Sequence, residues 1–82
     1  KMSSEFQPLI DHINSIIVEK TTSKGVREKL KVVLEILKDE TESDVAINKS
    51  LAILEEFESD PNIDSYTRTQ IYSIVSVLGQ FE

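Results

Sequence analysis

The chain contains 82 residues, enough for one small domain spanning 1–82 but not for a cofactor-binding domain beside a separate substrate domain. Its 9 basic and 15 acidic side chains give a formal net charge of −6, which disfavours nucleic acid or an anionic membrane as a partner. The absence of Cys excludes a disulfide framework and a thiolate metal site.

The uninterrupted apolar runs of the sequence are short. Runs such as 16–18 and 32–34 fall far below the roughly 20 residues needed to cross a bilayer or the about 7 to 15 of a signal-peptide core. We therefore expect a soluble protein that is neither exported nor bound to a membrane.

Apolar residues recur at spacings of three and four in four segments, the pattern of helices that each bury one face. In chain order, we expect helices at about 4–20, 23–39, 43–59 and 64–80. Ser23 is placed to cap the second helix, because its hydroxyl can accept a hydrogen bond from a free backbone N–H of the first turn. The pattern predicts an all-α fold, a four-helix up-and-down bundle.

The two halves of the chain align when one is shifted by 41 residues, half of the length. The apolar pairs are Phe6 with Ile47, Ile10 with Leu51, Ile13 with Leu54, Ile16 with Phe57, Leu30 with Ile71, Val33 with Ile74, Leu34 with Val75 and Leu37 with Leu78. This alignment predicts a bundle built from two pseudo-repeated helical hairpins. The alternative is that any two amphipathic hairpins of similar length align at some offset.

Charged residues follow the same offset, since Glu19 aligns with Asp60 and Arg27 with Arg68. Both Arg residues fall near the first turn of a helix, where the helix dipole disfavours a cation. An Arg that reaches back across its corner can bind either the acid at the end of the preceding helix or the exposed carbonyls there. We therefore expect Glu19, Arg27, Asp60 and Arg68 to act as structural clamps, in preference to an active-site role for the arginines.

Two groups of residues indicate a binding surface. Basic side chains gather about the first corner and the start of the second helix, whereas all the net negative charge lies in the second half of the chain. The second and fourth helices also carry apolar residues outside one stripe, which fit either a central position in the bundle or an interface with another copy. The candidate partner surface comprises Lys24, Arg27, Lys31, Ile36, Val77 and Tyr66.

No residue pattern supports catalysis, so we expect a protein that is not an enzyme, with no cofactor and no catalytic or metal site. His12 lies at the edge of the first apolar stripe and is expected to pack there. The two Gly residues cannot form either glycine-rich phosphate loop. An acidic cluster lacks the Glu-x-x-His pairs of bundle metal centres and fits a solvated face. The cluster contains Glu55, Glu56, Glu58, Asp60 and Asp64.

Several segments of the sequence together carry a resemblance to a known protein family. They are 53–56, Asp60-Pro61-Asn62, Thr67-Arg68-Thr69 and 74–78, with a looser match over 13–37. Together they resemble uncharacterised protein family number 147, which consists of small archaeal proteins. The resemblance implies a compact up-and-down helical bundle and an archaeal cytoplasmic protein, with no assigned activity or cofactor. The chain departs from the family pattern at Ser23 and Asp64, where proline is expected at a helix start, and at Gly25 in the first turn of the second helix.

These features predict a non-catalytic protein-interaction or structural module that binds an unknown protein partner or associates with itself. The alternative is an acidic regulator that occupies a basic surface of a nucleic-acid-binding protein. The two hypotheses use different surfaces, because the first relies on the basic corner and the second on the acidic cluster.

Overall fold

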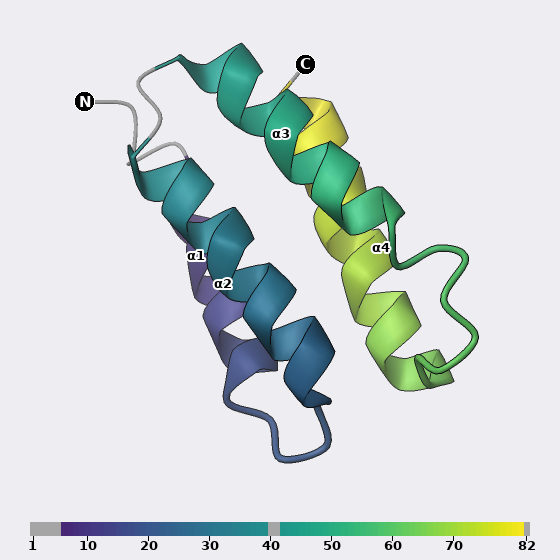
Figure 1. Cartoon of the computed structure of the whole chain (residues 1–82). Coiled ribbons are helices and arrows are strands. Elements are labelled where there is room, and N and C mark those ends of the chain that lie inside the picture. Colours follow the sequence, from purple (N-terminus) through teal and green to yellow (C-terminus); the bar gives the residue numbers. More distant parts are fainter. Residues whose placement is uncertain (1–5, 40–41, 82) are drawn as a thin grey trace.

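The computed structural model describes residues 6–39 and 42–81. The regular elements of these residues are all helices, with no strand among them. The helices are α1 (Gln7–Ile17), α2 (Lys24–Asp39), α3 (Ser43–Glu55) and α4 (Ser65–Gln80). Successive helices run in opposite directions, as Figure 1 shows. The connections 18–23 and 56–64 therefore lie at the same end of the molecule, which we call the corner end.

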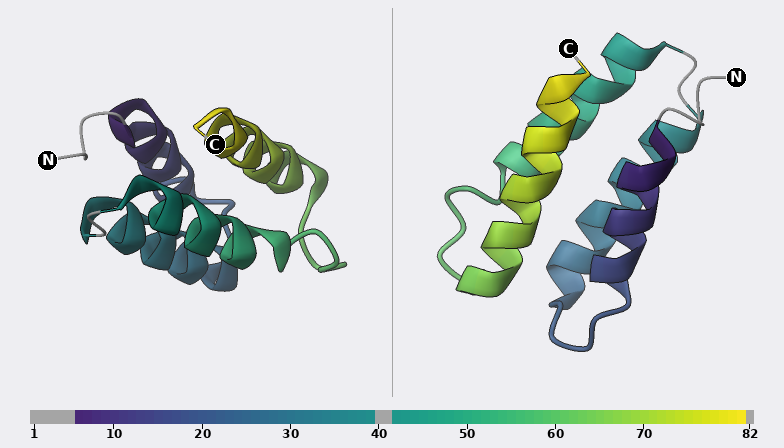
Figure 2. Two further views of the ribbon diagram at one scale, coloured as in Figure 1. Left: turned by 90° about the horizontal axis from the view of Figure 1, so that it is seen from above. Right: turned by 180° about the vertical axis from the view of Figure 1, so that it is seen from behind.

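The four helices form two layers. In the view from above in Figure 2, α1 and α4 lie in one layer, and α2 and α3 lie in the other. Each helix packs against the other helix of its layer and against one helix of the second layer, through the contacts α1–α4, α2–α3, α1–α2 and α3–α4. Each helix therefore has an inner face toward a shared core and an outer face toward solvent.

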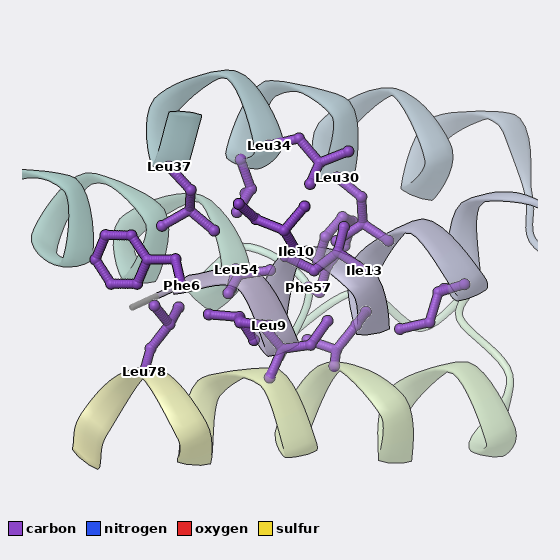
Figure 3. Close-up of a cluster of buried hydrophobic side chains, with 14 of the residues drawn as sticks. Phe6, Leu9, Ile10, Ile13, Leu30, Leu34, Leu37, Leu54, Phe57 and Leu78 are labelled. Carbon is purple, nitrogen blue, oxygen red and sulfur yellow. The ribbon is translucent and has the colours of Figure 1, made fainter. Parts of the chain in front are cut away.

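Apolar side chains from all four helices meet in this core (Figure 3). Its centre contains side chains that are 0% exposed: Ile13, Leu30, Val33, Leu54, Ile74 and Leu78. Away from the corner end, the rings of Phe6 and Phe81 meet edge to face, with centroids 5.1 Å apart and planes at 77°. The predicted apolar stripes are therefore the stripes that the helices bury.

Two helix ends differ from the prediction. α1 ends at Ile17 and α3 at Glu55, not near 20 and 59. After α1, the hydroxyl of Thr22 donates to the carbonyl of Ile16 at 2.6 Å, which turns the chain across the end of the helix. After α3, the N–H of Phe57 donates to the carbonyl three residues earlier at 3.0 Å, a tighter turn than an α-helix makes. Apolar periodicity continues past α3 because Phe57 stays buried outside the helix.

The start of α2 agrees closely with the sequence. The helix begins at Lys24, and the N–H of Val26 donates to the hydroxyl of Ser23 across a long contact of 3.4 Å. The predicted cap at Ser23 is therefore confirmed.

Candidate functional site

Arg27 is half-buried in the first turn of α2, and its side chain reaches back to the end of α1. Its Nε donates to the carbonyl of Ile17 at 2.8 Å, and its Nη2 donates to the carbonyl of Glu19 at 3.1 Å. Carbonyls at the end of a helix have no partner within the helix. The guanidinium therefore ties the first corner to α2 through charge-assisted hydrogen bonds.

Arg68 makes the same kind of contact at the second corner. Its Nη1 donates to the carbonyls of Glu58 at 3.0 Å and Phe57 at 3.3 Å. Its Nη2 donates to the carbonyls of Asp60 at 2.8 Å and Ile63 at 3.4 Å. One side chain thus gathers four carbonyls from the connection between α3 and α4.

The sequence allowed two kinds of partner for these arginines, an acidic side chain or the exposed backbone carbonyls. The hydrogen bonds in the structure are to carbonyls. Glu19 and Asp60 take part through their main-chain oxygens. The carboxylate of Asp60 accepts the N–H of Asn62 at 2.9 Å instead. Because its guanidinium is engaged at the corner, Arg27 is less available to a partner than the prediction assumed.

A surface hollow of about 310 Å³ lies between α2 and α3. It is lined by Gly25, Glu28, Lys29, Val32 and Ile53. The apolar part of the lining comes from Val32, which is 49% exposed, and from the half-buried Ile53. A Cβ added at Gly25 would meet no atom within 4 Å, so the space beside this glycine is open.

Charged side chains frame the hollow. Lys29 and Glu56 form an ion pair that joins α2 to the end of α3 across its edge. Both side chains are exposed, so the pair is worth only about 0 to 1 kcal/mol of stability. Lys24 and Lys31 are also exposed on α2, and their spacing of two helical turns places them on one face.

The six residues of the predicted partner surface do not form one patch. Lys24 and Lys31 are exposed on α2, and Ile36 packs against the core further along that helix. Val77 packs against the core from α4, and Tyr66, 54% exposed, lies at the start of α4 in the other layer. The residues of the predicted partner surface therefore lie on two different faces of the molecule.

The sequence did not predict the hollow itself. Val32 and Ile53 belong to different helices, so no local pattern joins them. Two signals were present in the sequence: Val32 lies outside the buried stripe of α2, and Gly25 occupies the first turn of a helix. Neither close packing nor a positive φ requires glycine at that position.

The acidic cluster and His12 are the other residues that the sequence analysis considered for chemistry. Glu55 and Glu58 are exposed, Glu56 is in the ion pair, and Asp64 occupies the N-cap position of α4. Within residues 6–39 and 42–81, no group of three His, Cys, Asp or Glu side chains could hold a metal ion. His12 is half-buried, and its Nε2 has no hydrogen-bond partner among the described residues. In the same part of the chain, no helix has the length and apolar character needed to cross a bilayer.

Comparison with known proteins identifies the family. The model of the uncharacterised protein family UPF0147 matches residues 1–81. A UPF0147 protein of Thermococcus kodakarensis is 31% identical over 81 residues, which cover 96% of this chain and 98% of that protein. A UPF0147 protein of Methanocaldococcus jannaschii is 37% identical over 67 residues, which cover 80% of this chain and 72% of that protein. No solved structure gives a significant match. The predicted resemblance is confirmed, and the chain belongs to the uncharacterised protein family UPF0147.

Proposed function

We propose that this protein is a non-catalytic protein-interaction module that binds a partner through the hollow between α2 and α3. The proposal is carried by Val32, which is 49% exposed on a helix whose other exposed side chains are all charged. With Ile53, Val32 forms a small apolar centre inside a charged rim. A centre depleted of charge and surrounded by polar groups is the usual layout of a protein-binding site.

The occupant that fits the hollow is a protein segment with one apolar anchor side chain and acidic residues beside it. A volume of about 310 Å³ lies at the lower limit for pockets that hold small molecules, and it suits one branched or aromatic side chain. Lys24 and Lys31 lie on the neighbouring face of α2 beside Glu28 and Glu35. An acidic segment that contacts the two lysines directly would be attracted by their charge and would associate faster.

We also propose that the scaffold is an up-and-down bundle of two pseudo-repeated hairpins. In support, α2 and α4 both contain 16 residues, and their first residues, 24 and 65, differ by the predicted offset. Arg27 and Arg68 each bind the carbonyls located ten and eight positions earlier in the chain. Aligned pairs such as Ile13 and Leu54 are equally buried. The cytoplasmic location and the lack of enzymatic activity remain predictions.

The test is affinity capture from a lysate of the source cells with the wild-type chain and two matched variants. Val32→Lys places a charge in the hollow, and Tyr72→Lys places the same charge at a residue of equal exposure, 48% against 49%, in the other layer. A partner held by the wild-type chain and by Tyr72→Lys, but lost from Val32→Lys, supports the proposal. Capture of the same proteins by all three chains would refute it.

The salt dependence of capture tests the role of the lysines. Raising the salt from about 0.1 M to about 1 M shortens the Debye length from about 10 Å to about 3 Å. We expect the partner to be lost at high salt and also from Lys24→Glu with Lys31→Glu. Retention at high salt would show that the lysines do not contribute to binding.

The alternative, an acidic regulator of a nucleic-acid-binding protein, is supported by the exposure of Glu55 and Glu58 at the second corner. In that case a basic partner would be lost from Glu55→Lys with Glu58→Lys and retained by Val32→Lys. The same capture experiment therefore distinguishes the two functions.

A further inference from the structure

The outer faces of α2 and α4 differ sharply in charge. Of the 16 residues of α2, eight are Asp, Glu, Lys or Arg, whereas α4, with the same length, has Arg68 alone. Arg68 is engaged with the carbonyls of the second corner. The outer face of α4 therefore carries no charge, in a chain of which 29% of residues are charged.

The exposed residues of α4 are hydroxyl and amide residues, one glycine and two tyrosines: Ser65, Tyr66, Thr69, Tyr72, Ser73, Ser76, Gly79 and Gln80. At 100° per residue they cover an arc of about 140°, with Tyr66 and Tyr72 on opposite sides of its centre. The two tyrosines are 54% and 48% exposed. We call this set of residues the α4 face.

Depletion of charge and enrichment in tyrosine are what distinguish the centre of a protein interface from the rest of a surface. Tyrosine suits such a position because its ring packs against the partner while its hydroxyl keeps a hydrogen bond. The composition of the α4 face therefore indicates a contact.

We propose that the α4 face binds a second copy of this chain about a two-fold axis. In such an interface the same patch meets itself, so the patch must be complementary to itself. Hydroxyl and amide groups meet this condition because each can both donate and accept a hydrogen bond. An unrelated partner could use the net charge of −6 through complementary cations, whereas a second copy carries the same net charge and is repelled least when it approaches through an uncharged surface.

The size of the molecule is compatible with this interface. A stable protein contact buries about 800 Å² on each partner, which is about a sixth of the 4977 Å² surface of this chain. The α1/α4 layer presents one of the broad faces of the molecule (Figure 2). Within that layer, α1 (Gln7–Ile17) contains a single Asp, Glu, Lys or Arg residue, Asp11.

The inference is independent of the proposed function, because the hollow lies in the α2/α3 layer. The test is the mass in solution, measured by sedimentation equilibrium from about 1 μM to about 1 mM, the range of weak to moderate affinities. The wild-type chain should approach twice 9.3 kDa. Tyr72→Lys and Ser76→Lys should raise the dissociation constant at least about tenfold, since each places like charges within the contact.

The matched control is Val32→Lys, which should dimerise like the wild-type chain and lose only the partner of the hollow. A wild-type chain that stays monomeric up to 1 mM would overturn the inference. A dimer unaffected by both α4 variants, or one lost in Val32→Lys, would place the interface elsewhere and would equally overturn it.

The chain provides a second readout that needs no variant. It has no Trp and two Tyr, and both tyrosines lie on the α4 face, so tyrosine fluorescence reports on this surface directly. Quenching by acrylamide should weaken as the concentration rises through the range in which the mass doubles. Unchanged quenching during dimerisation would show that the α4 face stays open.

Discussion

Replacing Arg68 by methionine should destabilise the protein more than the same change at Arg27. Arg68 donates to four carbonyl oxygens of the second corner, at 2.8 to 3.4 Å, whereas Arg27 donates to two at the first corner. Methionine keeps an unbranched apolar stem of similar reach, so the change removes mainly the hydrogen bonds.

The expected loss follows from the number and the exposure of those bonds. A hydrogen bond to a charged group contributes about 1.5 to 3 kcal/mol when it is protected from water. Both arginines are only half-buried, so water replaces part of each lost bond. We therefore expect a loss of about 2 to 3 kcal/mol for Arg68→Met and about 1 to 2 kcal/mol for Arg27→Met. For a chain of this length, 2 to 3 kcal/mol corresponds to a fall in Tm of about 10 to 20 °C.

Urea unfolding followed by far-ultraviolet circular dichroism measures these losses, provided that the slope m is unchanged. Lys31→Met removes an exposed cation from the same surface and should stay within about 0.5 kcal/mol of the wild-type chain. The loss at Arg68 should persist in about 1 M salt, because carbonyls carry no net charge, whereas a surface ion pair is screened. An Arg68→Met variant as stable as the control, or a loss that vanishes at high salt, would refute the clamp.

Three further substitutions test the packing in the same unfolding assay. Ser50 is fully buried and its hydroxyl has no partner in the described part of the chain. Ser50→Ala should therefore raise the free energy of unfolding by about 0.5 to 2 kcal/mol. An equal gain from the exposed Ser76→Ala would contradict this reason. Gly25→Ala should raise the free energy of unfolding by about 0.5 to 1 kcal/mol, since the new methyl group meets no atom within 4 Å. The same change should weaken partner capture, because the methyl group narrows the hollow. A loss of stability would show that the space is filled. Leu54→Ala should remove about 2 to 5 kcal/mol because Leu54 is 0% exposed, and a loss no larger than that of the half-buried Leu51→Ala would show that the core relaxes around it.

The helices and the core were predictable because they depend on local spacing. A residue such as Leu30 is followed by Val33, Leu34 and Leu37, and all four are buried on one face of α2. The period of the helix places them there whatever the neighbouring elements do. Apolar spacing therefore carried most of the information about the fold.

The ends of α1 and α3 were not predictable from the same pattern, because periodicity reports burial and not helical hydrogen bonding. Phe57 continues the apolar spacing of α3 and is buried, yet it lies beyond the last residue of the helix. The carbonyls at that corner are bound by Arg68, 11 positions later in the chain. In the sequence, a cation near a helix start predicts such a contact, but it does not show at which residue the preceding helix ends.

The hollow was not predictable for a related reason. Its two apolar members, Val32 and Ile53, approach only after α2 and α3 pack side by side. The α4 face, by contrast, comes from one continuous segment of the sequence. Its low charge can be read there directly, since 65–80 contains a single charged residue. The sequence does not show which of these residues are exposed, because exposure depends on the packing of the other helices.

The residues that hold this fold together and the residues proposed to bind partners are different, and the difference has a physical basis. Arg27 binds the carbonyl of Ile17 and Arg68 that of Asp60, and neither carbonyl accepts a backbone hydrogen bond in the described part of the chain, so we expect a loss of stability when either arginine is replaced. Exposed side chains of α2 and α4 such as Val32 and Tyr72 make no such hydrogen bonds, and we expect replacing either of them to change stability by no more than about 0.5 kcal/mol. Val32→Lys and Tyr72→Lys should therefore alter binding without altering unfolding. A large loss of stability in either variant would show that its side chain belongs to the packing, and would remove the surface that it marks from the proposed contacts.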